Sequence, residues 1–596
     1  MTLMLKLLKK MRRREIAMAA ICALLILAQI YFDLALPDYM TSLTKLLNTP
    51  GSATAEIMGI GGEMLACALA SAALSVACGY LAAKTAAGFS FTVRKCVFDK
   101  VMSFSHRELG QISVPSLITR TTNDITQLQM IVAMGLQMMI KSPIMAVWAV
   151  IKILGKSWEL SMVTAGFVVV ICALILAIMI VVLPRFRIVQ RLTDKINRVA
   201  RENLTGINVV HAFNAEDYQN AKFDKPSTEM MNTQLKNQRL MAVIQPMMGL
   251  FMNALALVIY WLGAALINDI PVADAAARLN MFSNVVVFST YATYVVMSFM
   301  MMVMIFMMFP SAQVSAERIN EVLESDNDIV PGTVTSAPET GTVEFKDVSF
   351  AYPGSPENQL SHISFRLERG KTLAIIGATG SGKSTLIGLI PRFYDATEGA
   401  VLVDGVDVRD YAPGALYDRL GYVTQKAVLF SGSIEDNVLF GESAAAQTEE
   451  TAAAAIEAAQ AKEFVDKLPE GTDYHIAQLG RNVSGGQKQR LAIARALARG
   501  AEILVFDDSF SALDYKTDAA LRGELSRRFA DTTKVIVAQR ISSIRHADEI
   551  IVLDRGEAVG IGTHDELMRS CEVYREIYFS QFPEERASYE KGGEQQ

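Results

Sequence analysis

Long apolar runs dominate the first half of the chain. A helical span needs about 20 predominantly apolar residues, and six runs meet that length. We expect spans at Ile16–Leu36, Met64–Ala83, Met130–Val150, Leu160–Leu183, Met241–Ile267 and Met281–Phe309. Charges interrupt only two of these runs, with Asp33 in the first and Lys141 in the third. Six buried helices of a soluble protein are a poor alternative, because they would need an enormous core.

Basic residues between the runs predict the orientation. Six precede the first run, and the segments Lys84–Gln129 and Pro184–Leu240 carry six and ten more, 22 in all. The other connections hold only Lys45, Lys152, Lys156 and Arg278. Because cytoplasmic loops are enriched in Lys and Arg, we expect both termini and both long segments in the cytoplasm. A cationic start is also typical of a secretory signal, but the long first run without a clear small-residue cleavage site favours a retained span.

The pattern changes after the last run. Pro310 ends that run, and Ala312–Leu323 is expected to continue it as a helix. The segment Ser325–Thr342 is rich in Asp, Pro, Gly, Ser and Thr, as linkers are. Short strand-like runs then alternate with helical stretches, which predicts an α/β domain. The expected strands are Val343–Phe345, Leu373–Ile376, Ile503–Phe506, Val535–Val537 and Ile550–Leu553.

These patterns predict the organisation of the chain. We expect a membrane domain of six transmembrane helices with long cytoplasmic extensions at 1–324, a linker at 325–342, an α/β domain at 343–581 and a polar, disordered tail at 582–596. Composition agrees: 51% of the 596 residues are hydrophobic, 20% are charged, and mean hydropathy is +0.27, which excludes disorder and disfavours a wholly soluble chain. The net charge of −6 gives no hint of a nucleic-acid partner. Six cysteines without ligand spacing indicate neither a disulfide framework nor a metal site.

A glycine-rich loop carries the clearest chemistry. The expected strand Leu373–Ile376 is followed by Gly-Ala-Thr-Gly-Ser-Gly-Lys-Ser-Thr at 377–385 and then by a helical stretch. This is the G-x-x-x-x-G-K-[ST] pattern in its strand–loop–helix context, where glycines let backbone N–H groups surround phosphates. Lys383 is expected to reach the β- and γ-phosphates of ATP, and the Ser384 hydroxyl to bind Mg²⁺. The expected ATP ligands here are Gly377, Thr379, Gly380, Ser381, Gly382, Lys383, Ser384 and Thr385.

Two carboxylates follow a second apolar strand. Ile503–Phe506 ends in Asp507, which is placed to bind Mg²⁺ as the second acidic element of a P-loop site. The next residue, Asp508, stands where a general base for the attacking water is expected.

The segment Val-Ser-Gly-Gly-Gln at 483–487 resembles the signature motif of ABC transporters, and it lies between the P-loop and Asp507 as in that family. Tyr352 resembles the adenine-stacking aromatic, Gln425 the Q-loop glutamine near Mg²⁺, and Ser511–Asp514 the D-loop. Six spans before one such domain resemble an exporter half-transporter. The resemblance implies that two chains pair and sandwich ATP between one chain's P-loop and the other's signature residues, here Ser484, Gly485, Gly486 and Gln487. It also implies a bacterial plasma-membrane location.

Two further segments resemble coupling helices, which transmit motion between the domains in this family. Arg120–Gln127 resembles the first and Ala212–Tyr218 the second, and both lie in the long polar segments. The stretch Ile476–Gly480 departs from the family, which often has a glutamate between two glycines there.

The ATP site departs from the family at two positions. Most exporters have Glu where this chain has Asp508, and His at the switch position where it has Gln539. Asp withdraws the carboxylate by one methylene, and a misplacement of about 1 Å can cost about 100-fold in rate. Gln can donate to a γ-phosphate, but it does not titrate as His does. Together these changes predict a site that binds ATP and hydrolyses it slowly.

The chain thus combines an altered ATP site with an intact signature. This combination predicts a heterodimer, in which a different half-transporter uses the signature of this chain. The expected function is ATP-driven export of amphipathic drugs, lipids or peptides. The methionines that crowd the sixth run suit apolar binding, although packing or lipid-facing roles are the plainer reading. Lys141 either attracts an anionic head group from an inward cavity or extends to the interface. An importer of exporter-like fold and an ATP-gated regulatory or channel-like protein remain alternatives.

Overall fold

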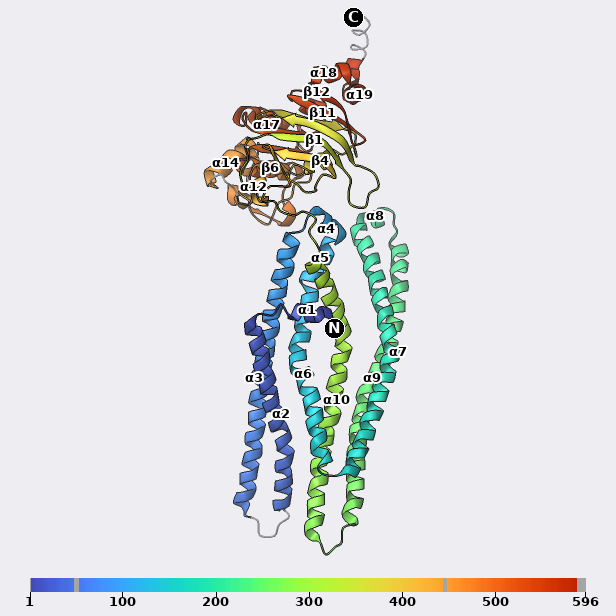
Figure 1. Cartoon of the computed structure of the whole chain (residues 1–596). Coiled ribbons are helices and arrows are strands. Elements are labelled where there is room, and N and C mark those ends of the chain that lie inside the picture. Colours follow the sequence, from blue (N-terminus) through green and yellow to red (C-terminus); the bar gives the residue numbers. More distant parts are fainter. Residues whose placement is uncertain (1, 48–52, 443–446, 587–596) are drawn as a thin grey trace, which may run out of the picture. The chain divides into compact units, whose positions relative to one another are not determined.

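The chain folds into two compact units (Figure 1). The computed structural model describes residues 2–47, 53–442 and 447–586. The helical unit comprises Met1–Met102 and Val114–Ser325, and the α/β unit comprises Ser103–Ser113 and Asp326–Gln596. The expected domain division did not anticipate that residues 103–113 join the α/β unit.

The helical unit consists mainly of long helices. They are α1 (Thr2–Leu8), α2 (Arg13–Leu47), α3 (Thr54–Met102), α5 (Val114–Thr121), α6 (Asn123–Leu154), α7 (Trp158–Thr205), α8 (Ile207–Ala212), α9 (Glu216–Asn268) and α10 (Ala275–Glu324). Six candidate spans occur within the described residues, in α2, α3, α5 with α6, α7, α9 and α10. Each expected span lies within one of these helices, so the predicted set of six is confirmed.

The long helices continue well beyond the apolar runs. The helices α3, α7, α9 and α10 contain 49, 48, 53 and 50 residues, whereas a span needs about 20. The two polar segments Lys84–Gln129 and Pro184–Leu240 are mostly helical and form the expected extensions of the spans. The long helices form antiparallel pairs, with α2 beside α3, α7 beside α9, and α6 beside α10 (Figure 1).

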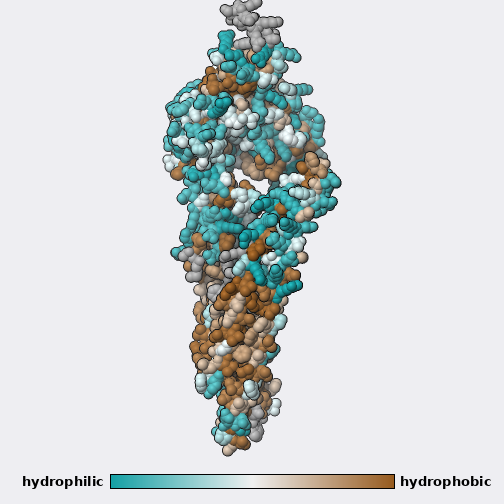
Figure 2. Space-filling view, turned by 90° about the vertical axis from the view of Figure 1, so that its right-hand side faces the viewer, coloured by the Kyte–Doolittle hydropathy of each residue, from teal (hydrophilic) through white to brown (hydrophobic). Residues whose placement is uncertain are grey.

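The span regions of the long helices expose apolar side chains. On the face shown in Figure 2, hydrophobic residues gather over the middle of the helices and hydrophilic residues lie toward both ends. Large side chains such as Leu69, Val169 and Leu257 are 62%, 66% and 70% exposed. Exposure on this scale suits contact with lipid, where an apolar side chain carries no desolvation cost.

An ion pair joins α2 to α6 inside the span region. The Lys141 ammonium donates to Asp33 Oδ2 at 3.0 Å, and the Ser71 hydroxyl of α3 donates to Asp33 Oδ1 at 2.5 Å. Both charged side chains are about three-quarters buried, at 26% and 20% exposed. Neither expectation for Lys141 describes this arrangement, because its charge is already neutralised by a neighbouring helix.

The α/β unit contains an antiparallel sheet of order β2-β1-β4-β5 and a six-stranded sheet of order β12-β11-β3-β10-β9-β6. The strands are β1 (Val343–Phe350), β2 (Leu360–Leu367), β3 (Thr372–Gly377), β4 (Glu398–Val403), β5 (Val406–Asp407), β6 (Leu420–Val423), β7 (Gly432–Ser433), β8 (His475–Ile476), β9 (Ile503–Asp507), β10 (Thr533–Val537), β11 (Glu549–Asp554) and β12 (Glu557–Gly562). In the larger sheet, β11, β3, β10, β9 and β6 are parallel and β12 is antiparallel. All five expected strands lie in these sheets.

Helices cover the sheets and connect them. They are α11 (Lys383–Gly388), α12 (Pro413–Tyr417), α13 (Ile434–Val438), α14 (Glu449–Ala458), α15 (Lys462–Val465), α16 (Gly485–Ala498), α17 (Tyr515–Arg528), α18 (His564–Ser570) and α19 (Glu572–Gln581), with short 3-10 turns at Gly471–Asp473, Gln478–Gly480 and Ile541–Ser543. The strands β9 and β10 are buried throughout, because side chains pack on both faces of the parallel sheet. Residues 583–586 of the expected tail form a helical turn, and 587–596 lie outside the described residues.

The short helix α4 (His106–Gln111) packs within the α/β unit. Its His106 ring lies 4.7 Å from the Phe393 ring and 5.8 Å from that of Tyr394, between ring centroids. Arg107 also forms an ion pair with Asp328. The segment Arg120–Gln127, which resembled the first coupling helix, belongs to the helical unit, whereas α4 belongs to the α/β unit and packs on its aromatic residues.

The polar side chains at positions 120 and 124 have their partners on α10, within the helical unit. The Arg120 guanidinium donates to the Arg318 carbonyl at 3.0 Å and pairs with Glu321 at 2.7 Å. Asp124 accepts from the Ser315 hydroxyl at 2.9 Å. These contacts join the end of α5 and the start of α6 to the C-terminal part of α10 within the helical unit.

The ion pair in the span region predicts an asymmetric mutational response. Lys141→Met leaves the Asp33 carboxylate with only the Ser71 hydroxyl, so we expect a loss of about 2 kcal/mol, below the roughly 3–5 kcal/mol of a fully buried pair. The double change Asp33→Asn with Lys141→Met removes both charges and is expected to cost less than the single change. Thermal unfolding of the purified chain in detergent measures both. Equal losses in the single and double variants would contradict this account.

Candidate nucleotide-binding site

The candidate site lies where four parallel strands end. Val537 of β10 is opposite Ile375 of β3 on one side and Asp507 of β9 on the other, and Val423 of β6 is opposite Phe506. Parallel strands share one carboxyl edge, where ligands bind in open α/β sheets. The chain therefore brings together the P-loop after β3, Gln539 after β10, the two carboxylates after β9 and Gln425 after β6.

Backbone geometry explains the glycines of the P-loop. Gly380 and Gly382 have φ of 86° and 100°, which side-chain-bearing residues rarely adopt. A Cβ at Gly377 would lie 2.1 Å from the Leu553 carbonyl oxygen. The Lys383 ammonium donates to the carbonyls of Gly377 and Ala378 at 2.9 and 2.7 Å, which holds it over the loop. Burial lowers the pKa of Lys383, and the charges of Asp508 and Asp507 oppose that shift.

Ser384 and Asp507 form an oxygen-rich corner beside the loop. The Ser384 hydroxyl donates to Asp507 Oδ1 at 2.9 Å. Asp507 is buried at the end of β9, and burial raises its pKa, with a further contribution from the charge of Asp508. Hydroxyl and carboxylate oxygens are the ligands that Mg²⁺ prefers, so this corner fits the ion.

Two amides converge on Asp508. Gln539 Nε2 donates to Asp508 Oδ2 at 2.9 Å, and Gln425 Nε2 lies 3.5 Å from the same oxygen. Asp508 has a φ of 46°, and its own N–H donates to the Val537 carbonyl at 3.1 Å, which holds the residue in this conformation. Burial raises the pKa of the Asp508 carboxyl. The carboxylate expected to position water is thus already engaged by the side chain at the switch position.

A cavity of about 360 Å³ unites these groups. Its lining consists of Tyr352, Gln359, Thr379, Gly380, Gly382, Lys383, Ser384, Thr385, Gln425, Asp507, Asp508, Val537 and Gln539. All of these except Gln359 and Val537 were predicted site residues. Of the predicted loop residues, Gly377 and Ser381 are outside the lining; Gly377 accepts from Lys383, and the buried Ser381 Oγ has no partner among the described residues.

An aromatic cluster borders the cavity. The Tyr352 hydroxyl is 2.9 Å from Thr385 Oγ1, and its ring meets the Tyr394 ring edge-on at 5.3 Å. Tyr394 in turn lies beside His106 of α4, and Phe350 packs on both tyrosines. Sequence reasoning identified Tyr352 and missed the other members, because they follow no motif and come from three separate elements.

Two more residues near the site were missed. Gln359 Nε2 donates to the Gly380 carbonyl at 3.3 Å and so supports the P-loop. Gln581, at the end of α19, donates to the Gln539 carbonyl at 2.8 Å and accepts from the Ile541 N–H at 2.9 Å. It therefore fixes the backbone on both sides of the switch position. Nothing in the sequence signals these roles, because both depend on long-range packing.

The signature residues do not line this cavity. Ser484 is the N-cap of α16: its hydroxyl accepts from the Gln487 N–H at 3.3 Å, and its N–H donates to Gln487 Oε1 at 2.8 Å. A Cβ at Gly485 would meet nothing within 4 Å, and one at Gly486 would lie 3.4 Å from the Ala512 carbonyl. Asp514 is the N-cap of α17 and accepts from the Thr517 N–H at 3.0 Å. The signature thus presents an open helix start separate from the P-loop of its own chain.

The cavity has the groups that a nucleoside triphosphate requires. It offers an aromatic ring, an ammonium, hydroxyls and a loop of backbone N–H groups, which together bind a base and its phosphates. Mg²⁺, held by Ser384, Asp507 and Gln425, would neutralise phosphate charge when bound. The residues present therefore fit both ATP and its usual ion.

Comparison with known proteins gives the family. The model of the ABC transporter transmembrane region matches residues 19–299, and the ABC transporter model matches residues 360–511. An uncharacterized ABC transporter ATP-binding protein of Mycobacterium tuberculosis is 38% identical over 536 residues, covering 89% of this chain and 90% of that protein.

Two other similarities cover most of the chain. The ATP-dependent lipid A-core flippase of Pseudomonas aeruginosa is 31% identical over 499 residues, covering 84% of this chain and 81% of the flippase. The structure of a bacterial Atm1-family ABC exporter with ATP bound has a TM-score of 0.78 and 23% identity, covering 96% of this chain and 99% of that one. The chain therefore belongs to the ABC transporters and carries a membrane region and an ATP-hydrolysing nucleotide-binding domain on one polypeptide.

Proposed function

We propose that this chain is one subunit of a heterodimeric ATP-driven exporter of amphipathic compounds, such as drugs, lipids or peptides. The observation that carries the proposal is the engagement of Asp508 by Gln539 in a cavity whose phosphate-binding groups are otherwise complete. In this proposal the chain's own site binds ATP and hydrolyses it slowly, and its signature completes an active site on a different half-transporter.

Similarity supports the direction and the class of cargo. A relative is named as a flippase for lipid A-core, and the fold is that of an exporter solved with ATP bound. The bias of Lys and Arg supports an orientation with both termini and the nucleotide-binding domain in the cytoplasm, and the family resemblance supports the plasma membrane as the location. Amphipathic cargo also suits a domain of six apolar spans.

The geometry around Asp508 supports slow hydrolysis. A general base has to lie within hydrogen-bond reach of the water from which it takes a proton. Asp508 Oδ2 accepts from one amide at 2.9 Å and lies 3.5 Å from a second, and the aspartate is a methylene shorter than the glutamate usual in this family. Gln539 can hydrogen-bond to a phosphate but cannot accept and return a proton as His does.

The location of the signature supports pairing with a second chain. Ser484 and Gly485 lie outside the cavity that holds Lys383 and Asp507. A partner signature is therefore needed to close this cavity, and the signature of this chain is free to close another. A homodimer would contain two slow sites, whereas a heterodimer with a partner that retains Glu and His contains one slow and one fast site.

Transport assays test the proposal as a whole. Inside-out vesicles containing this chain and its partner are expected to accumulate labelled amphiphile in an ATP-dependent manner. Loss of preloaded compound from the same vesicles would indicate an importer, and ATP binding without transport would indicate a regulatory protein.

Asp508→Asn is expected to leave most ATP hydrolysis by the heterodimer intact, with a change of less than about twofold, because the fast site uses the partner's base. Asn keeps an oxygen that can accept from Gln539, so the local hydrogen bonds persist. ATPase activity of the purified complex is the measurement, and Lys383→Met, which removes the phosphate-binding ammonium, serves as a control for ATP binding at this site. Abolished turnover with normal assembly and ATP binding would show that Asp508 belongs to a fully active site.

Ser484→Ala combined with Gly485→Asp is expected to reduce turnover about 100-fold, because it removes a donor and adds a negative charge beside the partner-bound phosphate. The space around Gly485 accommodates a side chain, so misfolding does not explain the loss. Ser433→Ala removes the equivalent cap of α13, where the serine hydroxyl accepts from the Asp436 N–H at 2.9 Å, and is the matched control, with about 1 kcal/mol of local destabilisation and normal ATPase activity expected. Equally mild effects for the signature and Asp508 variants would argue for two equivalent sites.

The slow site is expected to retain ATP through many turnovers. Its binding groups are complete, and only those that position and activate water differ from the family pattern. ATP favours the closed dimer only to the extent that it binds the closed state more tightly than the open state. A retained nucleotide therefore keeps one side closed while the other side binds and hydrolyses ATP. After labelled ATP is bound and free nucleotide removed, one intact ATP per heterodimer should remain during turnover. Exchange of both sites at the turnover rate would exclude such retention and leave the exporter assignment standing.

A further inference from the structure

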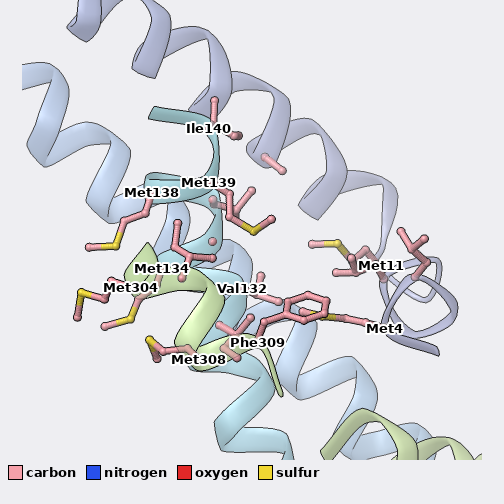
Figure 3. Close-up of a pocket in the computed structure, with 17 residues that line it drawn as sticks. Met4, Met11, Val132, Met134, Met138, Met139, Ile140, Met304, Met308 and Phe309 are labelled. Atoms are coloured by element: carbon pink, nitrogen blue, oxygen red, sulfur yellow. The ribbon is translucent and has the colours of Figure 1, made fainter. Parts of the chain in front are cut away.

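The helical unit contains an apolar cavity of about 460 Å³ that the nucleotide site does not explain (Figure 3). Its lining consists of Met4, Leu5, Leu8, Met11, Ala19, Ile131, Val132, Met134, Gly135, Leu136, Met138, Met139, Ile140, Met304, Ile305, Met308 and Phe309. Seven of the 17 are methionines, contributed by the N-terminal segment, α6 and α10. We call this the methionine pocket.

The walls of the methionine pocket accept only an apolar group. Its lining side chains are all apolar, so a hydroxyl or amide placed inside would lose its hydrogen bonds to water without replacement. Methionine side chains are flexible and polarizable and adapt to an irregular or mobile chain. These properties suit an acyl chain.

The pocket is open to its surroundings. Met139 and Met304 line it and are 51% and 47% exposed, and Leu5 is 49% exposed. Figure 3 shows Met134, Met304 and Met308 side by side, with Phe309 reaching toward Met4. A hydrocarbon chain can therefore enter without unfolding the helices.

The helix α1 forms one wall and is held in place by polar contacts. Lys6 pairs with Glu324 at 2.7 Å, and Asn320 Nδ2 donates to the Leu3 carbonyl at 3.1 Å. Leu7 is completely buried. These contacts attach α1 to the end of α10 and keep Met4, Leu5 and Leu8 in the lining.

A cluster of positive charge adjoins the apolar walls. Met11 lines the pocket, and the residues around it are Lys9, Lys10, Arg12, Arg13 and Arg14, all exposed. Arg12 lies over the Phe91 ring, whereas the other four have no ion-pair partner among the described residues. The nearby Glu15 is buried and accepts from the Arg12 N–H at 2.8 Å. The charge at the pocket is therefore strongly positive and uncompensated.

We propose that the methionine pocket binds one acyl chain of an anionic phospholipid of the bilayer, whose head group is held by Lys9, Lys10, Arg13 and Arg14. Apolar walls alone would accept any lipid. The adjoining cations select a negative head group, because basic residues next to a span attract anionic lipid. The proposal goes beyond ATP-driven export, and it does not depend on the heterodimer or on slow hydrolysis.

Photolabelling tests the proposal without nucleotide. The full chain is reconstituted in nanodiscs that contain a trace of phosphatidylglycerol with a diazirine in one acyl chain, and labelled peptides are identified after irradiation. We expect residues 131–140 and 304–309 to be labelled at least about fivefold more than with phosphatidylcholine carrying the same chain. Equal labelling by the two lipids would overturn the head-group assignment, and labelling spread evenly over the exposed faces of α3 and α7 would overturn the pocket.

Two variants and their matched controls separate the apolar and charged parts. Gly135→Phe adds a ring inside the pocket, where a Cβ has ordinary contact with Met139 Sδ at 3.5 Å, and it should reduce labelling about tenfold. Gly166→Phe adds the same ring on α7, where a Cβ meets nothing within 4 Å, and it should leave labelling unchanged. Equal effects of these variants would contradict the pocket assignment.

The second pair of variants tests the head group. The combined change Lys9→Gln, Lys10→Gln, Arg13→Gln and Arg14→Gln should abolish the preference for phosphatidylglycerol while labelling by phosphatidylcholine persists. These residues are exposed, so the change leaves the helical packing intact. The matched control, Arg191→Gln, Lys195→Gln, Arg198→Gln and Arg201→Gln on α7, removes the same number of charges and should not change the preference. A preference that survives the first change would overturn the proposal.

Discussion

The cost of leaving a polar group unpaired in an apolar environment governs both units. In the spans, every backbone N–H and C=O needs a partner within its own helix, so six apolar runs become six long helices. The same cost explains why Lys141 is found with Asp33 and Ser71: a lone ammonium at that position would be expensive, and a neighbouring helix supplies the counter-charge. Lys141, which the sequence suggested as a contact for an anionic head group, is thus paired with Asp33 of the same chain.

The nucleotide site obeys the same rule with a different outcome. Asp507 and Asp508 are buried carboxylates at the end of a buried strand, and each is held by a neighbouring donor, Ser384 for the first and Gln539 for the second. The Ser384–Asp507 contact brings together two oxygen groups that suit Mg²⁺. The Gln539–Asp508 contact joins the two residues that depart from the family pattern. Because they interact directly, we interpret the two departures as one altered unit, and this interpretation underlies the proposed slow site.

The two cavities differ in the chemistry of their walls. The nucleotide cavity places an ammonium, hydroxyls and carboxylates around a space of about 360 Å³, whereas the methionine pocket surrounds about 460 Å³ with apolar side chains alone. A polar ligand has partners only in the first, and a hydrocarbon chain loses nothing in the second. The proposed lipid site would therefore take a different class of ligand from the ATP site. It lies within the helical unit.

The sequence by itself determined the six spans, the α/β domain and the residues of the P-loop, because these depend on local patterns: a run long enough to cross a membrane, or glycines where φ is positive. It did not reveal that α4 packs on Phe393 and Tyr394, that Lys141 pairs with Asp33, or that Gln359 and Gln581 support the nucleotide site. Each of these contacts joins residues distant in the chain, and polar residues at such positions look the same in sequence whether they face water or a partner. The methionine pocket shows the difference most clearly: its methionines were visible in the sequence, but only the packing of the N-terminal segment against α6 and α10 placed seven of them around one space.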